Sequence, residues 1–161
     1  ELSKLDESAE EIQHETFDLS EAVLDTAANF ETIAKAHGLD FSVSAPEHIM
    51  YKGSEAELRQ LVSLLCDNAV KYASENGKVS VSLYKTSKNI CLDVYNDCDH
   101  VDKDQLPRLF DRFYRADNSR SRETGGYGIG LSIAKAIVER HKGKISAETS
   151  DSKSLVFKVV L

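Results

Sequence analysis

Three side chains with different chemistry lie at helical spacing in the segment LLCDNAVKYA. Asn68, Lys71 and Tyr72 stand at positions i, i+3 and i+4, so on an α-helix they share one face. Together they could contact Mg²⁺, a phosphate group and a planar base, because Mg²⁺ takes few protein oxygen ligands beside water and substrate phosphates. The alternative is a solvated helix face whose lysine stem covers apolar surface.

A glycine-rich stretch late in the chain, GGYGIGLSIAKAIVERHKGKI, is the second chemical feature. Gly126, Gly128 and Gly130 alternate with other residues directly before a segment of helical apolar periodicity. Clustered glycines mark positive φ angles or close approach of the backbone to a ligand, and a helix N-terminus can hold an anion. The stretch predicts either a phosphate-binding loop or a hinge whose glycines permit close helix packing.

The residues around these glycines exclude the better-known phosphate loops. A dinucleotide-binding fingerprint needs a hydrophobic strand before the glycines, whereas RADNSRSRET precedes them here. A Walker A loop needs Lys and then Ser or Thr after its last glycine, yet Leu131 and Ser132 follow Gly130. The partner segments of a protein-kinase glycine loop, such as His-Arg-Asp and Asp-Phe-Gly, do not occur in the sequence.

The composition indicates one soluble globular domain. The chain has 161 residues, 41% of them hydrophobic, and no apolar run of the length that crosses a bilayer. A net charge of −7 argues against nucleic acid as a partner. The three cysteines, Cys66, Cys91 and Cys98, form neither a CxxC pair nor a complete zinc-ligand set, which favours reduced thiols and a cytosolic setting.

Periodicity and turn residues predict the elements that must position these side chains. Residues 1–15 are acidic and polar and are expected to be a connector. Helices are expected from a cap at Asp18 or Ser20 to Gly38, over 55–74 after a capping box of Ser54 and Glu57, and over 129–141. Strands are expected over 39–45, 48–52, 78–86, 89–96, 144–149 and 154–161.

The order of these elements predicts an α/β two-layer sandwich. A mixed, largely antiparallel sheet would be covered on one face by the helices. The stretch between the strand that ends at Asn96 and Gly130 is long and polar. A loop of that length inside a compact domain usually carries function.

Three motifs in order resemble those of the bacterial sensor histidine kinases of the GHKL ATPase superfamily. LLCDNAVKYA is similar to the N box, LFDRFYRAD to the F box, and GGYGIGLSIAKAIVERHKG to the second glycine box. The resemblance covers about residues 16–161 and implies the Bergerat ATP-binding fold with a long mobile ATP lid. It implies that 16–161 form the catalytic and ATP-binding domain and that 1–15 connect it to an upstream helical dimerisation and phosphoacceptor domain.

The resemblance also implies roles for single residues. These are Asn68 as the Mg²⁺ ligand, Lys71 as a phosphate contact, Tyr72 as a ring beside adenine, Arg115 as the lid arginine at the γ-phosphate, and Gly126, Gly128 and Gly130 as the phosphate cradle. Arg112 is a second arginine of the F box. Phe110 and Phe113 resemble hydrophobic anchors of the lid, although plain packing gives the same sequence.

Two departures from the family pattern stand out. Where the family often has DxGxG, with the Asp accepting a hydrogen bond from the adenine amino group, this chain has NDCDH, so Asn96 takes that place and Asp97 and Asp99 are alternatives. An amide oxygen can still accept the bond, though without charge. Leu64, four residues before Asn68, stands where the family often has Asn and the ATP hydrolases of the superfamily have a glutamate base. The missing carboxylate favours phosphoryl transfer over hydrolysis.

The implied function is transfer of the ATP γ-phosphoryl group to a histidine on a separate domain. His14 is expected to belong to the connector, so the chain alone would bind Mg²⁺-ATP without phosphorylating itself. The resemblance implies a cytoplasmic domain of a membrane-anchored, homodimeric parent with a response regulator as downstream partner. The alternatives are a degenerate nucleotide-binding or scaffold module, favoured by Asn96, Cys98 and His100, and an anti-sigma-type serine kinase.

Overall fold

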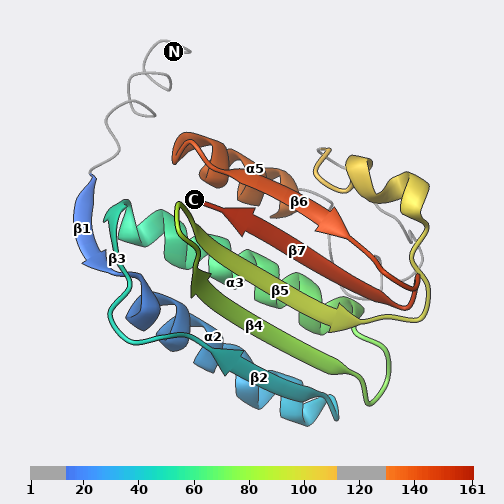
Figure 1. The fold of residues 1–161 in the computed structure, drawn as a ribbon. Coiled ribbons are helices and arrows are strands. Elements are labelled where there is room, and N and C mark those ends of the chain that lie inside the picture. Colours follow the sequence, from blue (N-terminus) through green and yellow to red (C-terminus); the bar gives the residue numbers. More distant parts are fainter. Residues whose placement is uncertain (1–13, 112–129) are drawn as a thin grey trace, which may run out of the picture.

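The structure is a computed structural model, and it describes residues 14–111 and 130–161. Figure 1 shows its elements, which are β1 (Glu15–Asp18), α2 (Leu19–Ala36), β2 (Asp40–Ser44), β3 (Met50–Gly53), α3 (Glu55–Tyr72), β4 (Lys78–Lys85), β5 (Ile90–Asp97), the 3₁₀ helix η1 (Lys103–Arg108), α5 (Gly130–Arg140), β6 (Lys144–Glu148) and β7 (Ser154–Val160). In this described part, no helix combines the length and apolar character of a membrane span.

The main sheet has five strands in the order β2-β4-β5-β7-β6. Strand β2 pairs with β4 in parallel, and every other neighbouring pair is antiparallel. The register places Val81, Val94 and Phe157 side by side across three strands. This topology confirms the predicted mixed, largely antiparallel sheet.

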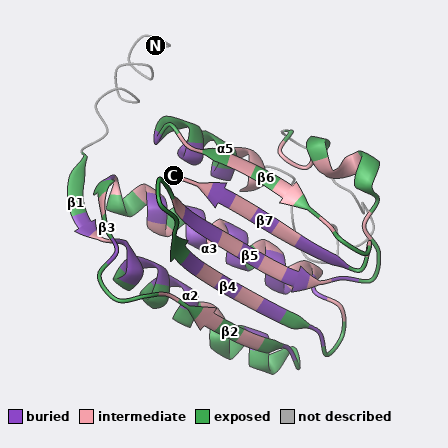
Figure 2. Ribbon diagram, in the orientation of Figure 1, coloured by how far each residue is buried: buried purple, intermediate pink, exposed green. Residues whose placement is uncertain are grey.

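One face of this sheet carries the helices and the other face is open. In Figure 1 the helices α2, α3 and α5 all lie behind the sheet. Buried and half-buried positions alternate along β4 (Figure 2), since Val79, Val81 and Leu83 are buried while Ser80 and Ser82, which line the open face, are half-buried. The two-layer α/β sandwich predicted from the element order is therefore confirmed.

Helix α2 begins and ends at residues that the sequence singled out. Asp18 is its N-cap, and its side chain accepts a hydrogen bond from the Glu21 N–H at 3.1 Å. Ser20 instead lies buried in the first turn, where its hydroxyl accepts a hydrogen bond from the Ile49 N–H. Gly38 follows the helix with φ = 74°, the left-handed conformation that glycine adopts without steric cost.

A two-stranded sheet stands apart from the main one and was not predicted as such. Strand β1 pairs antiparallel with β3, from Glu15 opposite Gly53 to Asp18 opposite Met50. Phe17 is the buried residue of β1, so the strand shows no apolar alternation long enough to recognise. Its pairing with a segment more than thirty residues away is a tertiary contact that local periodicity cannot reveal.

The capping box predicted at the start of α3 forms only in part. The Ser54 hydroxyl accepts a hydrogen bond from the Glu57 N–H, as expected. The reciprocal bond from the Ser54 N–H goes to His141 Nε2 at 3.1 Å, and the Glu57 carboxylate pairs with Arg140 at 2.7 Å. The prediction was wrong for the glutamate because residues at the end of α5, far along the chain, take both positions.

Candidate functional site

The second half of α3 presents the polar face that the sequence predicted. Asn68, Lys71 and Tyr72 are half-buried, whereas Leu65 and Ala69 of the same helix are fully buried in the core. Helix α3 packs between α2 and α5 and against β5. The structure thus places the three predicted residues together on one helix, at the margin of the core.

Lys71 takes part in an ion pair in this structure. Its Nζ lies 3.0 Å from Asp67 Oδ2, one helical turn earlier, and the two side chains are 33% and 51% exposed. An ion pair this exposed contributes about 0–1 kcal/mol. The ion pair with Asp67 therefore adds little to stability.

The turn after α3 lies against the end of β5. The Ser74 N–H donates to the Asp97 carbonyl at 2.9 Å, and the Lys78 N–H donates to Asp97 Oδ2 at 2.8 Å. Tyr72 is two residues before Ser74, so these bonds bring the end of the predicted helix face beside the strand that carries Asn96. Segments separated by more than twenty residues in the sequence meet here.

Asn96 is fully buried, on the face of β5 that carries Leu92 and Val94 toward the helices. Its Nδ2 donates to the Asp97 carbonyl at 3.0 Å, and its Oδ1 is buried with no hydrogen-bond partner among the described residues. A buried acceptor left unpaired costs about 1–3 kcal/mol. The site is therefore suited to a ligand that brings a donor, as the adenine amino group does.

The two alternative residues for reading the base lie differently. The Asp97 carboxylate is occupied by the Lys78 N–H at 2.8 Å and the Tyr95 hydroxyl at 2.6 Å. Asp99 is exposed, beyond the end of the strand. Asn96 differs from both, because its side chain lies on the helix side of β5 and its Oδ1 has no hydrogen-bond partner within residues 14–111 and 130–161.

The start of α5 lies beside the part of α3 that carries Asn68. A Cβ built on Gly130 would lie 3.7 Å from Leu64 Cδ2, which is an ordinary contact distance. Leu64 precedes Asn68 by one helical turn, so the N-terminus of α5 lies beside the polar part of α3. Helix packing at this point does not require a glycine. Gly126, Gly128 and Arg115 lie outside the described residues.

The segment after β5 is anchored to the sheet by apolar side chains. The rings of Phe110 and Phe157 meet edge to face, with centroids 5.9 Å apart and an interplanar angle of 74°. Val101, Leu106 and Leu109 also pack against the core. Phe110 packs on the core, which fits both an anchor of the lid and plain packing. Arg112 and Phe113 lie outside the described part.

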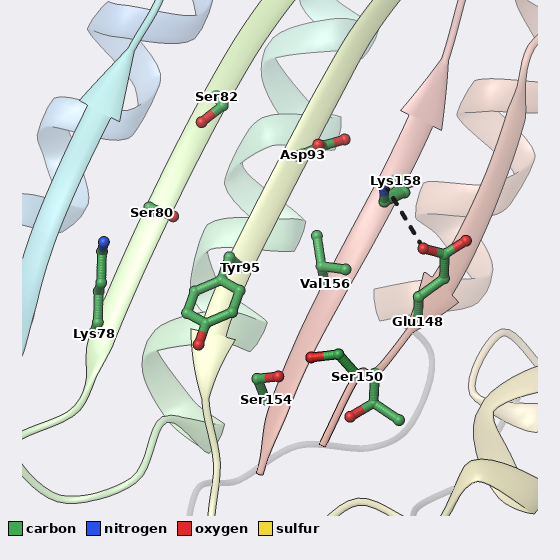
Figure 3. A pocket seen from close by; sticks show the side chains of 11 residues that line it. Lys78, Ser80, Ser82, Asp93, Tyr95, Glu148, Ser150, Ser154, Val156 and Lys158 are labelled. Carbon is green, nitrogen blue, oxygen red and sulfur yellow. Dashed lines mark ion pairs between the residues drawn. The ribbon is translucent and has the colours of Figure 1, made fainter. Parts of the chain in front are cut away.

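A shallow hollow of about 520 Å³ lies on the opposite, open face of the sheet (Figure 3). Its walls are polar and come from β4, β5, β6 and β7, with Tyr95 at its centre and an ion pair of 3.7 Å between Lys158 and Glu148. The sheet separates this hollow from Asn68 and Asn96. None of the predicted site residues belongs to it.

Two residues join elements in ways that no local pattern indicates. Asp97, one of the alternatives for reading the base, joins β5 to the turn after α3. His141 is buried and joins the end of α5 to the residue before α3, away from the candidate site. The hydrogen-bond partners of both residues come from distant parts of the chain.

A family model described as histidine kinase-, DNA gyrase B-, and HSP90-like ATPase matches residues 53–161. The chain belongs to this family. The match contains α3 with Asn68, strand β5 with Asn96, and the glycine-rich stretch before α5. The elements around the candidate site are therefore those of an ATPase family domain.

Two bacterial sensor proteins are among the curated relatives of this chain. The sensor protein CiaH of Streptococcus pneumoniae serotype 4 is 35% identical over 134 residues, which cover 83% of this chain and 30% of CiaH. The signal transduction histidine-protein kinase BaeS of Escherichia coli K12 is 35% identical over 149 residues, covering 92% of this chain and 32% of BaeS. The chain thus spans about a third of the length of these relatives.

Solved structures of histidine kinases share the fold. The catalytic domain of histidine kinase ThkA has a TM-score of 0.81 at 22% identity, covering 93% of this chain and 95% of that one. ThkA in a complex with response regulator protein TrrA gives a TM-score of 0.77 at 21% identity, covering 99% of this chain and 45% of ThkA. The expected GHKL fold is thereby confirmed.

Proposed function

We propose that this domain binds Mg²⁺-ATP and transfers the γ-phosphoryl group to a histidine on a separate domain of a sensor histidine kinase. The observation that carries the proposal is the Asn96 Oδ1, which is buried beside the turn that follows Asn68, Lys71 and Tyr72 and has no hydrogen-bond partner in the part of the chain that the structure describes. Membership of the ATPase family and the 35% identity to CiaH and BaeS support it.

The described residues supply distinct parts of such a site. The Asn96 oxygen would accept from the adenine amino group, the Tyr72 ring would lie beside the base, and the Lys71 ammonium would contact a phosphate. The N-terminus of α5 at Gly130 would face the anionic part of the nucleotide. Arg115, Gly126 and Gly128 enter the proposal from the sequence alone, as the γ-phosphate arginine and the rest of the cradle.

Asn68 would hold Mg²⁺ through its side-chain oxygen. The residue is half-buried on the polar face of α3, and a neutral amide oxygen is a ligand that Mg²⁺ accepts together with water and phosphate oxygens. The bound cation would neutralise charge on the transferring phosphoryl group. Leu64, one turn before Asn68, has no carboxylate to activate water, which favours transfer over hydrolysis.

The proposed partners follow from the relatives. They are an upstream domain that carries the acceptor histidine and dimerises, and a response regulator, as TrrA is for ThkA. We propose that the domain lies in the cytoplasm and that the parent is anchored in the bacterial membrane, in keeping with the relatives' names as sensors.

Calorimetric titration with ATP, in Mg²⁺ and in EDTA, tests the binding step. We expect ATP to bind and Mg²⁺ to strengthen the binding. The Asn68→Ala variant should lose most of that strengthening while its melting temperature stays the same, because Asn68 is not a core residue. Asn29→Ala, on the exposed part of α2, is the matched control and should behave as the unchanged chain. Failure of the unchanged chain to bind ATP would contradict the proposal.

Labelled ATP with a separate acceptor-domain fragment tests the transfer step. Acid-labile, base-stable label on the fragment is expected, and none on this chain alone. Two alternatives have their own outcomes. ATP binding without any label on the fragment would favour a scaffold module. The presence of Cys98 and His100 where the family has glycines supports that alternative. Acid-stable label on a serine would indicate the anti-sigma-type kinase.

A further inference from the structure

We propose that Asp97 makes the nucleotide site selective for adenine over guanine, by holding the Asn96 amide in the orientation that presents its oxygen. This inference rests on the proposed function, since it concerns how the same site reads the base. It assigns Asp97 as a positioning residue, because Asp97 acts through Asn96 and through the turn after α3.

The need for such a residue follows from the chemistry of an asparagine. A carboxylate can only accept hydrogen bonds, whereas an amide accepts at Oδ1 and donates at Nδ2. Adenine carries a donor, its amino group, at the position where guanine carries an acceptor oxygen. An Asn96 amide that turned over would therefore offer Nδ2 to guanine. Selectivity at this position requires that the amide does not turn over.

The Asp97 carbonyl supplies the restraint. Asn96 Nδ2 donates to it at 3.0 Å, which leaves Oδ1 as the unpaired atom. The reversed amide would place Oδ1 against that carbonyl, and two acceptors at hydrogen-bond distance repel each other. The Ser74 N–H donates to the same carbonyl at 2.9 Å, so the turn after α3 fixes its direction.

The Asp97 side chain keeps this carbonyl in place from the other face of the sheet. Its carboxylate accepts from the Lys78 N–H at 2.8 Å and from the Tyr95 hydroxyl at 2.6 Å. Figure 3 shows Tyr95 and Lys78 side by side on the open face, from adjacent strands. The bond to Asp97 raises the pKa of Tyr95 to about 12, because the bond favours the protonated phenol beside the carboxylate.

The turn itself leaves little room for the end of β5 to shift. A Cβ on Gly77 would lie 2.8 Å from the Ser74 carbonyl oxygen and 3.1 Å from Asp97 Cβ. A side chain at Gly77 would therefore collide with the turn and crowd Asp97, whose carboxylate the turn binds through the Lys78 N–H. Removing the carboxylate would release the Lys78 N–H and the Tyr95 hydroxyl together, and with them the restraint on the Asn96 amide.

The experiment compares ATP and GTP binding, each with Mg²⁺, in four forms of the chain. These are the unchanged chain, Asp97→Ala, Asn96→Asp and the double variant. We expect Asp97→Ala to lower the ratio of the GTP to the ATP dissociation constant by about tenfold, the size of one hydrogen-bond difference. In the Asn96→Asp background the same change should leave the ratio unaltered, because a carboxylate has no donor to turn toward guanine.

A merely structural role of Asp97 would not give this pattern. Loss of stability alone would weaken both nucleotides alike, and it would do so in both backgrounds. Asp93→Ala is the matched control, because Asp93 also accepts from a tyrosine hydroxyl, that of Tyr84, on the same face of β5 but away from Asn96. It should leave the ratio unchanged.

The Tyr95→Phe variant provides a second test if Asp97→Ala does not fold, since it removes only one of the two hydrogen bonds to the Asp97 carboxylate. It should lower the ratio in the same direction by a smaller factor. The inference is overturned if the unchanged chain binds ATP and neither variant changes the ratio, or if Asp97→Ala changes it equally in the Asn96→Asp background. Absence of ATP binding by the unchanged chain would instead contradict the proposed function.

Discussion

Asn96 and Asp97 are neighbours in the chain and serve opposite faces of the sheet. Strand geometry sends the Asn96 side chain into the helix layer and the Asp97 carboxylate to the open face. The first is left with an unpaired acceptor, and the second is paired twice. Both residues are candidates for reading the base in the pattern NDCDH. Because β5 extends to Asp97, the two side chains must point to opposite faces of the sheet, and that of Asn96 points toward the helices.

The bond between Tyr95 and Asp97 should be visible in the pH dependence of stability. The pKa of Tyr95 is raised to about 12 by this bond, so the folded chain holds the phenol proton more tightly than the unfolded chain does. Its contribution is complete below pH of about 10 and is lost as the pH rises from there toward 12. Tyr95→Phe should therefore flatten the fall of the free energy of unfolding over that interval, as followed by urea denaturation at pH 8, 10 and 11. Curves of equal slope would contradict the assignment.

The Gly130→Ala variant tests whether Gly130 belongs to a phosphate cradle or only permits close helix packing. Since a Cβ there would make an ordinary 3.7 Å contact with Leu64, Gly130→Ala should leave the chain as stable or up to about 1 kcal/mol more stable. ATP binding should nevertheless weaken, because the added methyl group hinders approach of the phosphates. Unfolding curves and ATP titration of the same preparation measure the two effects.

Gly143→Ala is the contrasting variant for that experiment. A Cβ on Gly143 would overlap the carbonyl oxygen of Val160, a backbone atom that cannot move aside easily. Stability should fall by about 1–3 kcal/mol. If Gly130→Ala lowered stability in the same way, the glycine would serve packing and the cradle would lose its support.

Helix α5 lies against α3 at both of its own ends. Near the candidate site Leu64 faces Gly130, and at the far end His141 and Arg140 bind the start of α3. His141 Nδ1 lies 2.8 Å from the Ile137 carbonyl, which can only accept, so Nδ1 carries the proton and Nε2 accepts from the Ser54 N–H. The neutral ring thus completes the cap that the Glu57 side chain was predicted to complete.

Replacing His141 should loosen this junction of elements. His141→Leu fills the buried space but leaves the Ser54 N–H without its acceptor, so we expect a loss of about 2 kcal/mol in the free energy of unfolding. Urea denaturation measures it. His100→Leu, at an exposed position, is the control and should change stability by less than about 0.5 kcal/mol. A loss as small as the control's would show that the Ser54 N–H finds another partner.

The candidate site depends on the complete fold, because it is made by α3, the end of β5 and the start of α5. These segments come together only when the sheet and the helix layer have formed. A ligand bound there favours the folded state over the unfolded chain. By mass action, Mg²⁺-ATP at 100 times its dissociation constant adds about 2.7 kcal/mol.

The melting temperature should report this linkage. For a chain of this size about 2.7 kcal/mol corresponds to a rise of roughly 5–10 °C. ATP in EDTA should give a smaller rise, because the cation that Asn68 would hold is absent, and differential scanning calorimetry measures both. Equal shifts with and without Mg²⁺ would contradict the role proposed for Asn68.

Most of the elements could be predicted because their signals are local. The apolar stripe with Leu58, Leu61 and Leu65 specified α3, and the alternation in KVSVSLYK specified β4. Strand β1 could not be predicted, since four residues with one buried side chain carry no period. The 3₁₀ helix η1 was also missed, because it is short and contains Pro107.

Local sequence patterns were enough to predict the α/β class, the helix face with Asn68, Lys71 and Tyr72, and the order of the motifs, since spacing along one element sets which residues share a face. The three-dimensional arrangement was needed to show that Asn96 Oδ1 has no hydrogen-bond partner among the described residues, that the Asp97 carboxylate binds the Lys78 N–H, and that His141 rather than Glu57 binds the Ser54 N–H. The physical reason is that hydrogen-bond partners in these places come from distant parts of the chain. Local periodicity carries no information about which distant group will arrive.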